Sequence, residues 1–266
     1  MFFRFLRVGL IVICAVAPLA RARDLRVCAD PDNLPFSDTE QRGFENKIAT
    51  LLAQDLNAHL VYVWQRMGRG FVREYLNKSK CDVLIGIPSD YRPVLTTTPY
   101  YRSTYVFVMR RDAPLQLTSL NDPALHRMKK IGVQVLDEEY APPGDALARR
   151  GMQAAIAGFS STGKDADSII RAVVDGKVDA AIVWGPLAGY FTRHYKNVLR
   201  VAAVSPPVDP PGIPLTFAIS MGVKKGNTQL RAELENFLER RHQQIQAILR
   251  HYAVPLTLEP ESRVGD

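Results

Sequence analysis

Cys28 and Cys81 carry the most specific chemistry in the sequence, because an isolated cysteine pair in an oxidising compartment usually forms a disulfide. The alternative is two buried free thiols. No Cys-x-x-Cys, Cys-x-x-Cys-His or His-Glu-x-x-His motif occurs, so haem attachment and zinc-protease chemistry lack their signatures. The five histidines are dispersed along the chain. We therefore expect a disulfide between Cys28 and Cys81 and no metal site.

Asp30, Glu45 and Asp137 are the acidic residues that could transfer protons. An enzyme would need such a general acid or base aimed into a cleft. Each of the three also has a simpler role, as a cap or as a solvated acid. The sequence therefore predicts no catalytic residue and no cofactor.

Residues 1–22 have the pattern of a secretory signal peptide. Arg4 and Arg7 precede an apolar run over 8–17, and Ala20-Arg21-Ala22 is a cleavage site of the Ala-x-Ala kind. The run is too short to span a bilayer comfortably, although a retained membrane anchor is the alternative. We expect a mature protein that begins near Arg23, lies in the periplasm and is not embedded in the membrane.

The charge balance argues against a nucleic-acid partner. The net charge of +7 falls to +4 when the signal peptide is removed, with 31 basic and 27 acidic residues scattered along the chain. Such a mildly basic surface suits contact with an acidic protein, and it is also typical of an ordinary solvated surface. A monomer is expected.

The segments 77–88 and 175–186 read alike: helix end, polar turn, Asp, apolar run, Gly and Pro. Hydrophobic periodicity and turn residues place each apolar run as the third strand of a strand–helix unit with a parallel sheet. Strands are predicted over 25–29, 60–64, 82–87, 105–109, 131–135, 154–159, 180–184, 198–204 and 215–223, and helices over 44–56, 71–76, 145–150, 165–174, 186–195 and 227–252.

These elements predict an α/β fold with two lobes and a cleft between them. Lobe 1 comprises 23–108 and 215–255, lobe 2 comprises 109–214, and 256–266 form a loose tail. The segments 105–109 and 215–223 are the two crossovers, and each lobe has a mixed sheet with helices. Ligands of such sheets bind at the carboxyl ends of strands. The alternative is one continuous α/β domain without a cleft.

This layout resembles the type II fold of the periplasmic solute-binding proteins of ABC transporters, family 3, in the amino-acid-binding branch. The resemblance is carried by 43–48, by Arg92 with Thr98-Pro99-Tyr100-Tyr101, and by 215–226. In that branch an arginine near 92 holds the ligand carboxylate, and a helix start in lobe 2 supplies backbone N–H groups. Here 137–139 read Asp-Glu-Glu, and an acidic helix start repels a carboxylate. Weak amino-acid binding is expected.

A narrower resemblance is carried by four segments in order: 26–37, 69–73, 81–86 and 183–190. They are similar to those of the quinoprotein-dehydrogenase-associated binding proteins, the MoxJ/XoxJ type that accompanies PQQ-dependent methanol dehydrogenases. This resemblance implies a role in the maturation or activation of a quinoprotein alcohol dehydrogenase, which would be the partner. The alternatives are a binding protein that delivers a small solute to an ABC permease, and a dehydratase-like enzyme on the same fold.

The predicted cleft residues follow the strand ends and the segments that carry the resemblance. Trp184 either lines the cleft or belongs to the core, and Arg92 either binds an anion or lies on the surface. Phe36 lies in a loop and should face the cleft. The segment 69–71 presents either a backbone N–H pocket or an ordinary helix cap. A small molecule or a peptide is the expected occupant. The set is Asp30, Asn33, Phe36, Arg69, Gly70, Phe71, Pro88, Arg92, Tyr100, Asp137, Trp184 and Gly185.

Overall fold

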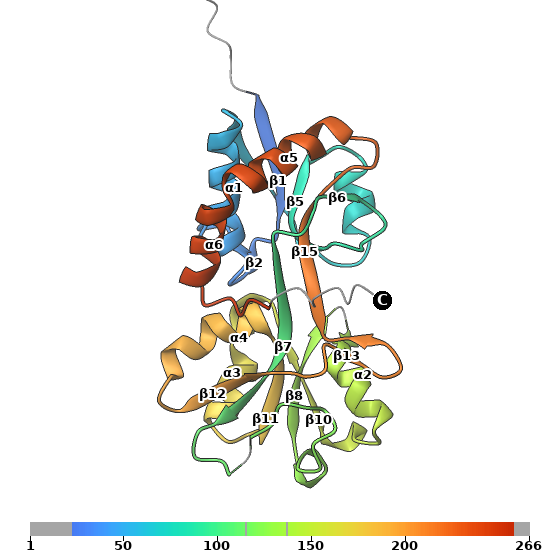
Figure 1. The fold of residues 1–266 in the computed structure, drawn as a ribbon, viewed down its shortest axis with the longest axis vertical. Coiled ribbons are helices and arrows are strands. Elements are labelled where there is room, and N and C mark those ends of the chain that lie inside the picture. The colour runs from blue at the N-terminus through green and yellow to red at the C-terminus, as the bar shows by residue number, and fades with distance from the viewer. Residues whose placement is uncertain (1–22, 115, 137, 258–266) are drawn as a thin grey trace, which may run out of the picture.

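The protein has two lobes stacked along its long axis (Figure 1). The computed structural model describes residues 23–114, 116–136 and 138–257, so the predicted signal peptide lies outside the described residues. Two long strands, β7 (Tyr101–Arg110) and β15 (Thr216–Val223), run from one lobe into the other. They pair antiparallel over the stretch between the lobes. The connection between the lobes is therefore double-stranded.

Lobe 1 is built on a mixed sheet with the strand order β15-β5-β1-β4. Strands β1, β4 and β5 run parallel, as helical crossovers require, and β15 joins antiparallel. The other elements surround this sheet. The elements are β1 (Asp24–Ala29), β2 (Asp32–Asn33), β3 (Ser37–Asp38), α1 (Phe44–Asp55), β4 (His59–Trp64), the helical turn η1 (Val72–Leu76), β5 (Val83–Pro88), β6 (Leu95–Thr96), α5 (Thr228–Arg240) and α6 (His242–His251).

Lobe 2 repeats this plan with the order β10-β8-β11-β7, in which β7 is the antiparallel strand and also pairs with β12. Helices connect its parallel strands, as in lobe 1. The elements are β8 (Ile131–Leu136), β9 (Glu139–Tyr140), α2 (Pro142–Arg149), β10 (Ile156–Ser160), α3 (Ser168–Val174), β11 (Ala180–Trp184), α4 (Gly185–Thr192), β12 (Leu199–Ala203), β13 (Val208–Asp209), β14 (Ile213–Pro214), and the short turns Leu125–Arg127, Gln153–Ala155, Gly163–Asp165 and Arg193–Tyr195.

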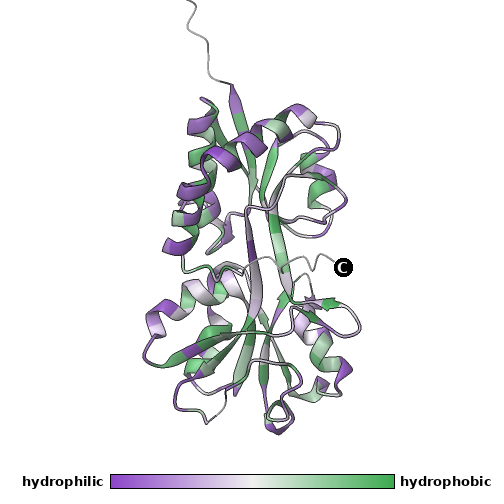
Figure 2. Cartoon of the chain, viewed as in Figure 1, coloured by the Kyte–Doolittle hydropathy of each residue, from purple (hydrophilic) through white to green (hydrophobic). Residues whose placement is uncertain are grey.

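Each lobe has its own hydrophobic core. In lobe 1, Phe44 of α1 and Phe237 of α5 are fully buried beside the sheet. In lobe 2, Phe107 and Val108 of β7 point to opposite faces of the sheet, and each is fully buried in a separate cluster. Figure 2 shows the apolar residues concentrated in the strands and the hydrophilic residues on the outer helices. Alternation along strands covered on both faces explains the near-continuous apolar runs in the sequence.

The prediction of a two-lobed α/β fold with mixed sheets and two crossovers is confirmed, and the single domain without a cleft is wrong. On β7, Tyr101 belongs to the core of lobe 1 and Tyr105 to that of lobe 2, so the chain leaves lobe 1 before residue 108. On the return, Leu215 belongs to lobe 2 and Ile219 to lobe 1. The hinge therefore lies where β7 and β15 pair.

The predicted single helix over 227–252 is wrong, because the chain forms α5 and α6 with a break at Arg241. Asp55, at the end of α1, accepts hydrogen bonds from Arg240 Nη2 at 2.5 Å and from Arg241 Nε at 2.7 Å. This double clamp accompanies the turn that lets α6 pack against α1. The predicted inward residues are nevertheless buried or partly buried in the core of lobe 1: Leu230, Leu234, Phe237, Leu238, Ile245, Ile248 and Leu249.

The repeated sequence segments have the same structural role in both lobes. Asp82 donates its N–H to the Arg26 carbonyl at 2.7 Å, and its carboxylate accepts the Arg26 N–H at 2.9 Å. Asp179 donates its N–H to the Lys130 carbonyl at 2.9 Å, and its carboxylate accepts the Lys130 N–H at 3.0 Å. In each lobe an aspartate therefore fixes the register of the third strand against the first.

The predicted disulfide is present between Cys28 on β1 and Cys81 just before β5, with the two Cα atoms 5.5 Å apart. The prediction of this pairing is confirmed, and its reason is that β1 and β5 are neighbours. At the other end of the chain, Thr257 donates its N–H to the Arg102 carbonyl at 3.0 Å, and the rest of the predicted loose tail lies outside the described residues. Among the helices that the structure describes, none is long and apolar enough to cross a bilayer.

Candidate functional site

A cavity of about 440 Å³ lies between the lobes, beside the two crossover strands. Five of the predicted cleft residues line it: Asp30, Asn33, Phe36, Pro88 and Trp184. They come from the loop after β1 and from the ends of β5 and β11, where ligands of open α/β sheets bind. The other lining residues are Glu45, Met67, Gly86, Tyr101, Tyr105, Gln134, Leu136, Pro142, Ser161, Thr162, Leu187, Phe217 and Ile219.

The two lobes contact each other at the mouth of this cavity. Arg69 of lobe 1 donates from Nη2 to Glu139 Oε1 of lobe 2 at 2.7 Å, and both side chains are exposed. Strand β2 of lobe 1 also touches the turn Gly163–Asp165 of lobe 2. The lobes are therefore in contact across the rim of the cavity, and the predicted cleft residue Arg69 lies on this rim instead of in the cavity.

Tyr100 does not face the cleft, which corrects its prediction. It is buried and lines a different hollow on the outside of lobe 1, next to α5, whereas its neighbour Tyr101 lines the cavity. Successive side chains of an extended segment point in opposite directions, so only one of the two tyrosines can face the cleft. Arg92 is exposed in the loop between β5 and β6 and does not line the cavity.

Three further predicted residues serve the fold. Phe71 is buried beside Cys28 and Cys81 and stacks on Tyr75, with ring centroids 4.9 Å apart. Gly70 has a φ of +85°, so it forms the turn before η1. Gly185 begins α4, and a Cβ there would lie 2.6 Å from the Thr104 carbonyl oxygen. The prediction that these three residues line the cleft is corrected, because none of them lines the cavity. The predicted cleft residue Asp137 lies outside the described residues.

The acidic end of the cavity consists of Asp30 and Glu45. Asp30 is buried, and its two carboxylate oxygens accept the N–H groups of Asp32 at 3.0 Å and Met67 at 2.9 Å. Glu45 lies in the first turn of α1 and is enclosed between this aspartate and Gly86, where any side chain would overlap the Glu45 carboxyl. Burial, reinforced by the Asp30 charge, raises the pKa of Glu45 well above its usual range.

The opposite wall of the cavity is aromatic and comes from the hinge and lobe 2. Tyr105, Trp184 and Phe217 form a triangle of ring contacts, with centroid distances of 5.3, 5.7 and 6.4 Å. The Trp184 N–H donates to Oε1 of the buried Gln134 at 2.5 Å, which fixes the end of β11 against β8. Trp184 also packs against the cores of both lobes, so its two predicted places, cleft and core, coexist.

The helix starts around the cavity offer few backbone N–H groups to an anion. At α1, the N–H groups of Phe44 and Glu45 donate to the Pro35 and Phe36 carbonyls at 2.8 and 2.9 Å. Helices α2 and α4 both have proline in their first two positions, and proline has no N–H. Among the described lining residues, none is lysine, arginine or histidine. A ligand carboxylate would therefore find no arginine among the described lining residues and few free N–H groups at the starts of α1, α2 and α4.

The expectation that 137–139 begin a helix is wrong. Glu138 has a φ of +70°, Glu139 lies in β9, and α2 begins only at Pro142. A positive φ is typical of a tight turn, and here it allows β9 to fold back antiparallel onto β8. The described acids Glu138 and Glu139 are therefore in a hairpin, and Glu139 pairs with Arg69 across the mouth.

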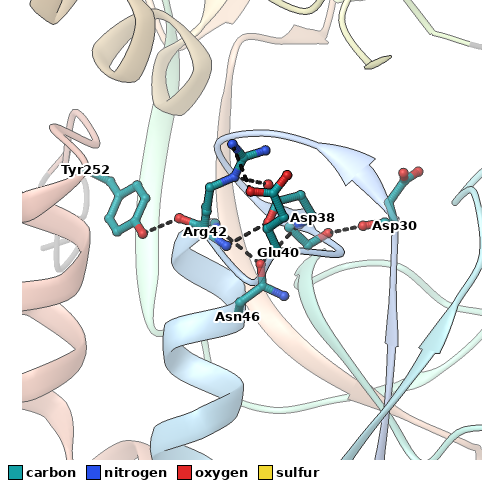
Figure 3. A network of polar contacts seen from close by, with 8 residues as sticks. Asp30, Asp38, Glu40, Arg42, Asn46 and Tyr252 are labelled. Atoms are coloured by element: carbon teal, nitrogen blue, oxygen red, sulfur yellow. Dashed lines mark hydrogen bonds and ion pairs between the residues drawn. The ribbon is translucent and has the colours of Figure 1, made fainter. Parts of the chain in front are cut away.

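The loop that carries Asn33 and Phe36 is held by a polar network (Figure 3). Buried Asp38 accepts the Arg42 N–H at 2.7 Å, and Asn46 Oδ1 accepts the N–H groups of Asp38 and Gly43, both at 3.1 Å. Tyr252, after α6, donates its hydroxyl to the Arg42 carbonyl. The wall of the cavity in lobe 1 is thus built on a fixed loop.

Five cavity residues were not predicted from the sequence, and Glu45 was predicted only as a proton-transfer candidate. The five are Gly86, Tyr101, Tyr105, Gln134 and Phe217. A usable signal existed in the crossovers. Residues 101 and 105, like 217 and 219, are separated by an even number of positions and so share one face of a strand. That face of each crossover lines the cavity.

Comparison with known proteins places the chain. The model of the bacterial extracellular solute-binding proteins, family 3, matches residues 25–254. Protein MoxJ of Paracoccus denitrificans is 32% identical over 90% of this chain and 91% of its own length. The crystal structures of MxaJ from Methlophaga aminisulfidivorans MPT and XoxJ from Methylobacterium extorquens AM1 are 28% and 35% identical, with TM-scores of 0.76 and 0.70; each match covers 88% of this chain and 100% of the other. The chain belongs to the bacterial extracellular solute-binding proteins, family 3.

Proposed function

We propose that this chain is a periplasmic accessory protein that assists the maturation or activation of a PQQ-dependent methanol or alcohol dehydrogenase. The observation that carries the proposal is the similarity to MoxJ, MxaJ and XoxJ over almost the whole described chain. The cavity supports it, because an aromatic wall without a carboxylate clamp departs from ordinary amino-acid capture.

The rim of the cavity offers a surface for the dehydrogenase. Met67 of lobe 1 and Leu136 of lobe 2 line the cavity and are 37% and 48% exposed, and Tyr140 in the neighbouring strand β9 is 45% exposed. Large apolar side chains that stay in water beside a cleft are typical of interaction sites. The mildly basic mature chain would also approach an acidic partner faster at low ionic strength.

No catalytic role is proposed. Both carboxylate oxygens of Asp30 are occupied by backbone N–H groups, and Glu45 has no described base or nucleophile beside it with which to form a catalytic pair. Delivery of a small solute to an ABC permease is the second candidate, because the interlobe cavity is large enough for a small ligand.

The test is dehydrogenase activity and PQQ content in periplasm from a strain that lacks this protein. We expect inactive or cofactor-poor dehydrogenase, restored by the wild-type chain. Leu136→Asp should restore it poorly, whereas Val201→Asp, at a comparably exposed apolar residue of β12, should restore it fully. Normal amounts of active, PQQ-loaded enzyme together with impaired uptake of a small solute would favour the transport function instead.

A further inference from the structure

The cavity has a negative end without a positive counterpart. Asp30 and Glu45 line it, and the described lining residues include no lysine, arginine or histidine. The two carboxylate oxygens of Asp30 accept backbone N–H groups, at 3.0 and 2.9 Å. The Glu45 carboxyl is half-buried beside Gly86, and no described residue forms a hydrogen bond with it. A carboxyl group that lines a cavity without a positive partner leaves that place to an occupant.

The titratable groups close enough to act on Glu45 do not stabilise its charged form. They are the Asp30 carboxylate at the end of β1 and the phenols of Tyr62 on β4, Tyr100 before β7, and Tyr101 on β7. The Tyr100 hydroxyl is itself buried without a hydrogen-bond partner. No cation is among these groups, and burial together with the Asp30 charge raises the pKa of Glu45, so its protonated form is favoured.

The aromatic wall complements this acidic end. Tyr105, Trp184 and Phe217 present ring faces and edges within one cluster on the far side of the cavity. Such rings bind apolar bodies and also attract cations through their negative faces. We infer that the cavity binds an organic cation with an apolar or aromatic body, its positive group against Glu45 and Asp30 and its body against the rings.

This inference also predicts which ligands are rejected. An amino acid carries a carboxylate, which would lie near two acidic side chains and beside helix starts that are capped or occupied by proline. The favoured ligand is therefore an amine or guanidine without a carboxylate. When its positive group arrives, the Glu45 carboxyl releases its proton to solvent and becomes the counter-ion. Binding of the cation should then tighten as pH rises.

The experiment is a calorimetric titration of the purified mature protein with three probes that share one phenyl body: 2-phenylethylammonium, 2-phenylethanol and 3-phenylpropionate. We expect the ammonium to bind at least roughly tenfold more tightly than the alcohol, a difference of about 1.4 kcal/mol, and the carboxylate to bind most weakly. From pH 6 to pH 8 the ammonium affinity should rise, whereas that of the alcohol should not change. Glu45→Gln should reduce the preference for the ammonium and abolish this pH dependence.

Glu40→Gln is the matched control, because Glu40 is an exposed glutamate outside the cavity that pairs with Arg42. It should leave all three affinities unchanged. Equal affinity for ammonium and alcohol, tightest binding of the carboxylate, or no binding of the ammonium would overturn the inference. The wild-type pH series is informative even if the Glu45 variant fails to fold. The titration needs no dehydrogenase, so a negative titration would not argue against the proposed accessory role. Likewise, the periplasmic test of the accessory role does not test whether the cavity binds a cation.

Discussion

The two lobes share the same strand arrangement, here called the frame, but they contribute opposite ends of the cavity. In each, an aspartate at the third strand, Asp82 or Asp179, exchanges backbone and carboxylate hydrogen bonds with the first strand. Beyond this frame they diverge. Lobe 1 contributes the acidic end, Asp30 and Glu45, whereas lobe 2 contributes Trp184 and two helices with proline in the first two positions.

The fold and the site depend on different parts of each lobe. The shared aspartates lie before the third strands, whereas the residues that differ between the lobes lie around the carboxyl ends of the strands, where loops and helix starts can change without disturbing the sheets. The similarity to family 3 proteins therefore predicts the frame. The acidic and aromatic ends predict the ligand.

Removing the disulfide should have the largest effect on the free energy of unfolding. It should destabilise lobe 1 more than lobe 2. The bond closes a loop with a sequence separation of 53, entirely within lobe 1. On the chain-entropy model, Cys28→Ala with Cys81→Ala should lower the free energy of unfolding by about 4 kcal/mol. Hydrogen exchange should show faster opening in β1 and β5 than in β8 and β11. Uniform acceleration in both lobes would mean that they unfold as a single unit.

Replacing Glu45 should have the opposite effect on stability, because it should raise the free energy of unfolding. Its pKa is raised in the folded protein, so folding favours its protonated form, and this stabilisation is lost as pH rises through the folded pKa. Glu45→Gln should therefore stabilise the protein near neutral pH by about 1–2 kcal/mol, a typical cost of an unsatisfied buried polar group, and much less near pH 4. Thermal melts across this range measure the difference.

Asp55→Asn is the matched control for the sign, because Asp55 is a carboxyl of lobe 1 whose pKa is shifted in the opposite direction. Hydrogen bonds from Arg240 and Arg241 lower its pKa, so its contribution is present at neutral pH and lost as pH falls through the folded pKa. This variant should be destabilised at pH 7 and hardly at all in acid. The same sign for both variants would contradict the assignment of Glu45 as an unpaired carboxyl.

Most of the fold could be predicted because local pattern decides it. Apolar runs between turns located β5 and β11, and helical spacing located α1. The break between α5 and α6 could not be predicted, because it coincides with the contact between Arg241 and Asp55, which are 186 residues apart. A continuous apolar stripe gives no sign of such a distant contact.

The site was less predictable, for a geometric reason. Strand-end residues such as Asp30 and Trp184 were found, because topology alone brings strand ends together. Whether Tyr100 or Tyr101 lines the cavity depends on which face of the crossover strand turns toward the cleft. The resemblance in the Pro-Tyr-Tyr segment does not indicate that face. Glu45 reads as a helix-start acid, and its enclosure beside Gly86 appears only after folding.

The smallest expected effect concerns the ion pair that joins the lobes at the mouth. Arg69 and Glu139 are 2.7 Å apart, but their side chains are 77% and 75% exposed, so the pair should contribute less than about 1 kcal/mol. Breaking the ion pair should change the arrangement of the lobes more than their stability, because the pair connects the two lobes and is not part of either hydrophobic core. Arg69→Glu places two acids at the mouth and should favour an opened cleft, visible as a larger radius of gyration in solution scattering.

Combining Arg69→Glu with Glu139→Arg should restore the closed dimensions, since the pair is re-formed with the charges exchanged. The same reversal at Arg73, whose exposed partner Glu74 lies in the same lobe, should leave the radius unchanged. High salt should weaken the difference between Arg69→Glu and wild type, because both charges are in water. If Arg69→Glu stays closed at low salt, the rim does not hold the lobes together, and closure rests on the contact of β2 with Gly163–Asp165 and on the hinge.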